Sequence, residues 1–228
     1  MSMFSYWFGV SEKSIASHCI LSPLDDVGVF SDLGITGTYQ GRFFKTVLTR
    51  SATILVSRLN FLVGDCVLAL QKTPCEFIYF FGSCGSTGHL SVGDIGLVEK
   101  AYCLESVTEM LSFRSSLKVV LPDKLLTETV RKSTGLRPMR VATVNSLLLE
   151  NAYLPVFSKS AVSCVDMECS IVLSASAYAR KKAVALLYVT DKVSANPFSR
   201  KISTIRRSKI SASRQHLARL LMTSLSHA

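Results

Sequence analysis

The stretch at residues 77–102, FIYFFGSCGSTGHLSVGDIGLVEKAY, joins two apolar runs through a glycine-rich segment. The runs Phe77–Phe81 and Ile95–Ala101 are rich in aromatic or β-branched residues and have the length of buried strands. Glycines follow the first run at positions 82, 85 and 88, so we expect the backbone to turn there. The Ser83 hydroxyl and nearby backbone amides would then face an anion or a polar ligand, although a plain glycine turn explains the pattern as well. The spacing matches neither the dinucleotide fingerprint nor a P-loop.

Strands and helices are expected to alternate on both sides of this stretch. Further strands are expected at Phe4–Val10, Phe43–Leu48, Thr53–Ser57, Met139–Thr143 and Val184–Val189. Helices are expected at Val63–Gln71, Leu121–Thr134, Glu168–Lys182 and Ser211–Leu225, with a flexible segment at 194–208. This alternation predicts an α/β fold, a three-layer α/β/α sandwich with a twisted mixed central sheet. At 228 residues we expect one domain, 1–228.

The composition is that of a core-rich globular protein. Hydrophobic residues make up 48% of the chain and charged residues 18%, and no apolar run reaches the length of a membrane span. The first residues carry neither a basic flank nor a clear cleavage site, so we expect a cytoplasmic protein without a membrane partner. Seven cysteines without a C-x-x-C pair and four scattered histidines indicate reduced thiols, and we expect neither a metal nor a cofactor.

Positive charge gathers in the second half of the chain. Residues 1–120 have a net charge of −1 and residues 121–228 a net charge of +11. Such a surface could meet nucleic acid or another polyanion. Aromatic residues do not accompany the charges, so we favour a solvated helix and expect no nucleic-acid partner.

Three short polar stretches follow expected apolar strands, and ligands of α/β sheets bind beyond the carboxyl ends of strands. The first contains Ser83 and Gly85. The second is Asp166-Met167-Glu168 at a helix start, where carboxylates also suit the positive end of the helix dipole. The third is Thr190-Asp191 after a buried strand. A carboxyl in that position can act as a general acid, or simply serve as a cap or turn residue.

Taken together, these motifs point to one family. The order G-S-C-G, V-G-D-I, M-E at a helix start and T-D after a strand resembles the nucleoside phosphorylase and nucleosidase superfamily. Its members often read G-[ST]-x-G, V-G-D, V-E-M-E and S-D in that order. The resemblance covers residues 77–192 and implies a nucleoside phosphorylase-like fold that cleaves N-glycosidic bonds.

The resemblance also implies roles for individual residues. Glu168 would bind the ribose 2′ and 3′ hydroxyls with Met167 packed against the sugar, and Asp191 would protonate N7 of the departing purine. Thr190 stands where the family usually has serine, and Asp166 where it usually has a first glutamate. These roles suit an oxocarbenium-like transition state, because the ribose must be held rigidly and the base leaves better when protonated.

Two further residues favour hydrolysis over phosphorolysis. In bacterial phosphorylases that resemble this motif, an arginine two residues before the first glycine binds phosphate, whereas this chain has Phe80. In the family's hydrolases, a glutamate just after the first strand activates water. Glu12, which follows the expected strand Phe4–Val10, is the candidate for that role, with a surface charge as the alternative.

The expected substrate is a 5′-modified purine nucleoside. Methylthioadenosine/adenosylhomocysteine nucleosidases use an aromatic residue and an aspartate near the adenine, where this chain has Leu147 and Asn145. The two differences favour a relative of futalosine or aminofutalosine hydrolase, which acts in a route to menaquinone. The methylthioadenosine reaction, a purine nucleoside phosphorylase and a non-catalytic relative that binds polyanions remain alternatives. The family's hydrolases usually pair, so we expect a homodimer.

Overall fold

The computed structural model describes residues 2–25, 27–57, 59–112, 117–193 and 203–225. Its strands are β1 (His18–Ser22), β2 (Ile35–Gln40), β3 (Phe44–Thr49), β4 (Thr53–Ser57), β5 (Phe77–Ser86), β6 (Ile95–Leu104), β7 (Lys118–Val120), β8 (Pro138–Val144), β9 (Cys164–Asp166) and β10 (Lys182–Lys192). Its α-helices are α1 (Met3–Phe8), α2 (Val63–Ala69), α3 (Val107–Leu111), α4 (Lys124–Thr134), α5 (Leu154–Lys159), α6 (Cys169–Tyr178) and α7 (Thr204–Leu225). Short 3-10 helices are η1 (Glu12–Ser14), η2 (Val27–Leu33), η3 (Asn60–Leu62), η4 (Leu70–Lys72) and η5 (Glu150–Tyr153).

The strands form one mixed sheet in the order β10-β6-β8-β9-β5-β1-β4-β3-β2, with β7 paired to β6. The long strand β5 also pairs in parallel with β10, so β5, β10, β6, β8 and β9 close into a ring. Strand β5 pairs in parallel with β1 and antiparallel with β9. Because β5 contacts β1, β9 and β10, its carboxyl end is surrounded by strand ends and is a natural place for a ligand.

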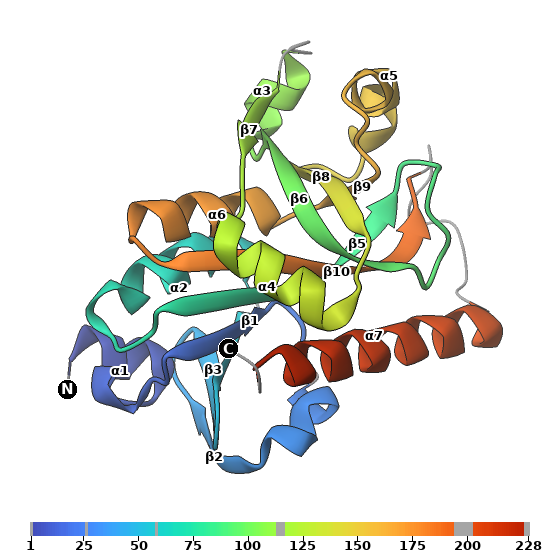
Figure 1. The fold of residues 1–228 in the computed structure, drawn as a ribbon. Helices are drawn as coiled ribbons and strands as arrows, with labels where there is room; N and C mark the ends of the chain where they lie inside the picture. Colours follow the sequence, from blue (N-terminus) through green and yellow to red (C-terminus); the bar gives the residue numbers. More distant parts are fainter. Residues whose placement is uncertain (1, 26, 58, 113–116, 194–202, 226–228) are drawn as a thin grey trace.

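Helices cover both faces of the sheet and give three layers (Figure 1). On one face, α1, α2 and α6 contribute buried residues to a core that they share with the sheet. On the other face, η2, α4 and α7 contribute to a second core. This arrangement confirms the predicted α/β/α sandwich with a mixed central sheet. No helix in the described ranges has the length and apolarity needed to cross a bilayer.

Successive residues of the central strands alternate between these two cores. In β10, Ala185 and Leu187 pack with α1, α2 and α6, whereas Leu186 and Tyr188 pack on the opposite face. Because side chains of a strand point alternately to its two faces, a strand covered on both sides reads as a continuous apolar run. This explains why the apolar runs at 77–81 and 184–189 could be recognised as strands.

The glycines of the opening stretch do not form the expected turn. Strand β5 continues to Ser86 through Gly82 and Gly85. A Cβ atom at Gly82 would lie 2.8 Å from the ring of Phe80, so this glycine makes room for a core side chain within an extended strand. The chain turns farther on, where Gly88 and Gly93 have φ angles of 137° and 94°. The expectation of a turn at 82–85 is therefore wrong.

The expected strand Phe4–Val10 is also wrong, because these residues form the helix α1. The Ser2 hydroxyl accepts a hydrogen bond from the amide of Ser5 at the start of the helix. Gly9 ends it in the left-handed conformation, with φ at 75°. Phe4 and Phe8, one helical turn apart, stack at 4.3 Å and are buried. The first strand of the chain is β1.

The other expected elements are confirmed with small changes in their bounds. The expected hairpin corresponds to β3 and β4, which pair antiparallel. The helix predicted at Leu121–Thr134 begins at Lys124 and ends at Thr134, with Gly135 as its C-cap, and the last helix begins at Thr204. Of the segment expected to be flexible, residues 194–202 lie outside the described residues, and residues from Thr204 onward belong to α7.

Candidate active site

A cavity of about 230 Å³ lies where β5, β9 and β10 end. It contains every predicted site residue except Glu12. These residues are Ser83, Gly85, Leu147, Asp166, Met167, Glu168, Thr190 and Asp191. The remaining lining residues are Pro23, Leu24, Cys84, Glu150 and Val165. The three polar stretches predicted from the sequence thus meet in one place, although they lie far apart in the chain.

Asp191 reaches the cavity because strand β10 contains a bulge. Val189 pairs with Cys84 and Asp191 pairs with Gly85, so Thr190 is an extra residue in β10. A bulge of this kind redirects the side chains that follow it. The Thr190 hydroxyl donates a hydrogen bond of 2.7 Å to Oδ1 of Asp191. A Cβ atom at Gly85 would lie 3.5 Å from Oδ2 of Asp191, so the glycine leaves space beside this carboxyl oxygen.

The last helix, α7, also holds the bulge, through Arg206. The guanidinium of Arg206 in α7 donates two hydrogen bonds to the carbonyl oxygen of Thr190, from Nε at 3.1 Å and from Nη2 at 2.8 Å. Paired donation by a planar guanidinium restricts orientation as well as distance. Arg206 therefore connects the basic helix α7 to the strand that carries Asp191.

Asp166 lines the cavity, and both oxygens of its carboxyl accept hydrogen bonds from the protein. Oδ1 accepts a hydrogen bond of 2.7 Å from the hydroxyl of Thr143, and Oδ2 accepts one of 2.7 Å from the amide of Cys169. The second bond caps the first turn of α6. Burial raises the pKa of Asp166 to about 7, although these hydrogen bonds act in the opposite direction. These hydrogen bonds give the Asp166 carboxyl a structural role.

Glu168 is buried at the start of α6 and lines the cavity together with Met167. Burial, and then the nearby charge of Asp166, raise the pKa of Glu168 to about 8. A carboxyl that is removed from water in this way gains by forming hydrogen bonds to a ligand. Perturbed carboxyl groups in a cavity are typical of functional sites.

Comparison with known proteins identifies the fold. No protein-family model matches the sequence, and no curated protein matches it either. Solved structures do match. Uridine phosphorylase from Vibrio fischeri ES114 has a TM-score of 0.76 at 14% identity, over 96% of this chain and 95% of that chain. The chain has the nucleoside phosphorylase fold.

Two nucleosidases share this fold with the chain. The 5′-methylthioadenosine/S-adenosylhomocysteine nucleosidase of Campylobacter jejuni has a TM-score of 0.74 at 12% identity, over 93% of this chain and 100% of that one. Futalosine hydrolase from Helicobacter pylori strain 26695 has a TM-score of 0.70 at 13% identity, over 94% of this chain and 99% of that one. The resemblance expected from the motifs is thereby confirmed for the fold.

Within this nucleoside phosphorylase fold, Glu12 lies away from the cavity. It begins η1, before the first strand, and accepts a hydrogen bond of 3.0 Å from the exposed Ser2 hydroxyl. The strand that motivated its assignment is the helix α1. The loop that does follow the first strand contributes Pro23 and Leu24 to the cavity. The structure therefore does not bring Glu12 to the other predicted residues.

Glu150 is the lining residue that sequence reasoning missed. It begins η5, in the loop after β8 that also contributes Leu147. Its side chain is buried, and no motif surrounds it. The one signal in the sequence was its position shortly after Leu147, in the segment where the family resemblance implies residues that contact the base.

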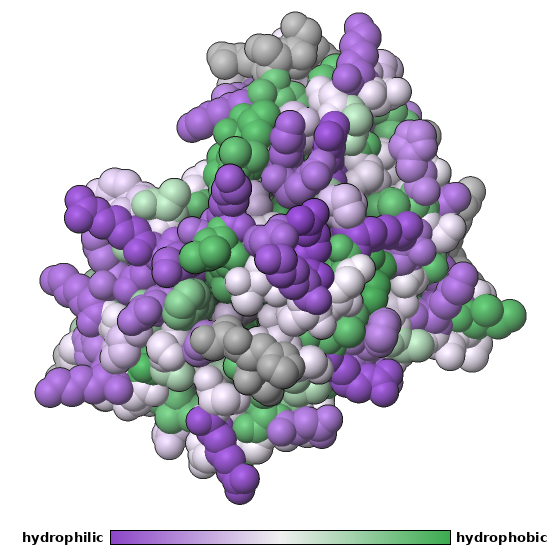
Figure 2. All heavy atoms as spheres, in the orientation of Figure 1, coloured by the Kyte–Doolittle hydropathy of each residue, from purple (hydrophilic) through white to green (hydrophobic). Residues whose placement is uncertain are grey.

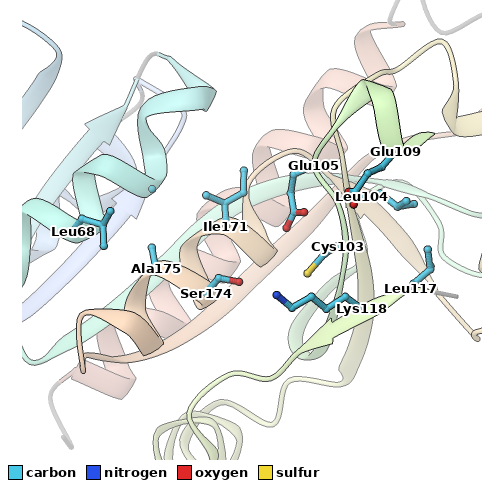
Figure 3. A pocket seen from close by; sticks show the side chains of 11 residues that line it. Leu68, Cys103, Leu104, Glu105, Glu109, Leu117, Lys118, Ile171, Ser174 and Ala175 are labelled. Carbon is cyan, nitrogen blue, oxygen red and sulfur yellow. The ribbon is translucent and has the colours of Figure 1, made fainter. Parts of the chain in front are cut away.

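A larger cavity, of about 840 Å³, lies on another side of α6 (Figure 3). Side chains of α6, including Ile171 and Ser174, face Cys103 of β6 and Lys118 of β7 across it (Figure 3). None of the predicted site residues lines it. Its lining residue Glu105 accepts a hydrogen bond from the Ser170 hydroxyl of α6.

Proposed function

We propose that this protein hydrolyses the N-glycosidic bond of a purine nucleoside in the 230 Å³ cavity. The observation that carries the proposal is the charge of the lining. The lining residues include four carboxyl groups (Glu150, Asp166, Glu168 and Asp191), and none of those described is a lysine, arginine or histidine.

The acidic lining favours water over phosphate as the second substrate. A phosphate dianion would enter a confined space whose described lining offers no cation to balance its charge. Phe80, which stands where related phosphorylases have an arginine, is fully buried in the core. Water carries no charge and meets no such barrier.

The same lining suits the chemistry of the ribose. Positive charge develops on the sugar as the bond to the base breaks, and nearby carboxylates stabilise that charge. We assign Glu168 to accept hydrogen bonds from ribose hydroxyls and Asp191 to donate a proton to N7 of the base, because both line the cavity. The substrate that we favour carries a 5′ substituent, as in futalosine or aminofutalosine, with 5′-methylthioadenosine as the second candidate. Support comes from the fold shared with hydrolases of both kinds.

The test is base release from a panel of nucleosides, with and without phosphate. Adenosine, inosine, 5′-methylthioadenosine, futalosine and aminofutalosine would be offered to the purified protein, and free base and sugar measured by chromatography. We expect release of base and free sugar at equal rates in both buffers. A requirement for phosphate, with accumulation of a sugar 1-phosphate, would make the protein a phosphorylase. Failure to release any base, together with salt-sensitive binding to polyanions, would favour the non-catalytic alternative.

We also propose that the protein forms a homodimer. Figure 2 shows an apolar patch over α3 and β7, where Val107, Leu111 and Val119 are exposed by 42%, 61% and 44%. Exposed apolar patches of this kind are typical of interaction surfaces. Sedimentation at micromolar concentration should give twice the mass of one chain, and Leu111→Glu should reduce it to one. The control Ile205→Glu changes an exposed residue of α7 and should leave the dimer intact. A parent protein that sediments as single chains would contradict the proposal.

A further inference from the structure

Glu150 has no structural task that explains its burial. Glu150 is only 6% exposed and lines the cavity together with Leu147. Among the described residues, no hydrogen bond or ion pair holds its carboxyl, in contrast to Asp166, which caps α6. A buried carboxyl without such partners is costly unless a ligand uses it.

Glu150 and Asp191 both line the cavity. Burial raises the pKa of Glu150 to about 7, and the charge of Asp191 raises it as well. A carboxyl with such a pKa can donate or accept a hydrogen bond near neutral pH. With Asp191 as the proton donor to N7, as proposed above, Glu150 supplies an acceptor in the same lining.

One oxygen of Asp191 accepts no hydrogen bond from the described residues. Oδ1 already accepts from the Thr190 hydroxyl, whereas Oδ2 lies beside the space left by Gly85.

The edge of a purine next to N7 differs between bases. Adenine presents N7 as an acceptor and the 6-amino group as a donor, whereas 6-oxopurines present two acceptors, N7 and O6.

We propose that Glu150 determines the base specificity of this site: together with Asp191 it presents one donor and one acceptor, which match the N7 and 6-amino edge of adenine and mismatch a 6-oxopurine. This inference rests on the proposed function and narrows its substrate to 6-aminopurine nucleosides, so that of the candidates above aminofutalosine and 5′-methylthioadenosine fit and futalosine, a 6-oxopurine nucleoside, does not. A 6-oxopurine should bind more weakly because its O6 would face another acceptor. A buried polar group without a hydrogen-bond partner lowers the affinity.

The test uses two nucleosides that differ only at position 6, 5′-methylthioadenosine and 5′-methylthioinosine. For the parent protein, kcat/KM should be at least about tenfold higher for the 6-amino compound. Glu150→Gln should bring the two values to within about threefold, because a glutamine amide can turn either its oxygen or its nitrogen to the base. The control Glu128→Gln changes a half-buried glutamate of α4 that pairs with Arg131 and Lys132 and does not line the cavity, and it should keep the parent's ratio.

Calorimetric titration of the parent and Glu150→Gln with adenine and with hypoxanthine separates this inference from the proposed function, because it requires no catalysis. Tighter binding of adenine that depends on Glu150, without base release, would support the inference and reject the hydrolase. Base release with no preference for the 6-amino compound, or with a preference that survives Glu150→Gln, would overturn the inference and leave the hydrolase in place. Equal binding of both bases without release would reject both.

Discussion

Asp166 and Glu168 are two residues apart and have different tasks. Both oxygens of Asp166 accept hydrogen bonds, from Thr143 and from the first turn of α6, so this carboxyl holds the helix in place. Glu168 lines the cavity with a pKa raised to about 8, mainly by burial. We therefore assign the proposed ribose contact to Glu168 and not to Asp166. Asp166 supports the backbone from which Glu168 projects.

Asp191→Asn tests the general acid. Asparagine keeps the size of the side chain and removes the transferable proton, so turnover should fall by about 10²–10⁴ while nucleoside binding largely survives. Glu168→Gln should instead raise KM as well as lower the rate, because it weakens the hold on the ribose. Steady-state kinetics on the best nucleoside of the panel measures both effects. Asp65→Asn, on the exposed side of α2, serves as the control. If Asp191→Asn stays within about threefold of the parent, well short of the loss expected for a general acid, Asp191 is a structural residue of the bulge.

Individual site residues were predictable where a motif surrounded them. The order of the motifs predicts that Ser83, Glu168 and Asp191 belong to one site, and all three line one cavity. Glu150 has no motif, and only the folded loop after β8 brings it inward. Glu12 was misplaced because its assignment depended on a first strand that does not exist at 4–10.

Among the elements, strand β5 explains why the glycine-rich stretch was misread. Glycine permits a turn, but it also permits close approach of a side chain to an extended backbone. Phe80 and Asp191 occupy the spaces beside Gly82 and Gly85, and neither contact is visible in the sequence. The short strands β1 and β9 were missed for a related reason. Each has only three to five residues, and its identity as a strand depends on its neighbours in the sheet.

The junction of β10 and α7 gives a prediction at the element scale. Arg206→Met removes both hydrogen bonds to the Thr190 carbonyl and keeps an apolar stem, so the bulge that aims Asp191 should loosen. We expect kcat to fall by about tenfold with little change in KM, because small displacements of a catalytic group are costly. Arg207→Met removes the same charge from an exposed neighbour and should leave kcat unchanged. Equal kinetics in the two variants would show that Arg206 only tethers the helix.

At the scale of the whole molecule, the fold was predictable because its strands are covered on both faces. Apolar runs such as Val184–Val189 stand out in the sequence, and helices between them place a layer on each side of the sheet. The closure of β5, β10, β6, β8 and β9 into a ring was not predictable, because it depends on pairings between distant residues. Solved structures at 12–14% identity have the same fold, so the fold tolerates different residues at most positions.

The buried carboxyl groups should make the stability of the whole molecule depend on pH. Relative to ordinary values of 4.5 for glutamate and 3.8 for aspartate, burial raises the pKa of Glu150 and of Asp166 to about 7 and that of Glu168 to about 8. Between pH 4 and 8 the folded chain therefore binds more protons than the unfolded chain. The free energy of unfolding then falls as pH rises through this window, by up to about 1.4 kcal/mol per pH unit for each extra proton.

The effect is clearest above pH 6.5. The pKa of His18 is lowered by burial, and a lowered histidine pKa affects stability only below its ordinary value of 6.5. Without ligand, Tm should therefore drop by several degrees between pH 6.5 and 8.5, since about 1 kcal/mol corresponds to 2–4 °C in a chain of this size. Glu168→Gln removes one of the titrating groups and should flatten the decline, whereas Glu128→Gln, at a half-buried residue of α4, should not. A Tm that stays constant or rises across this range would mean that these carboxyl groups are already ionised in the fold at pH 6.5, and that burial does not raise their pKa values.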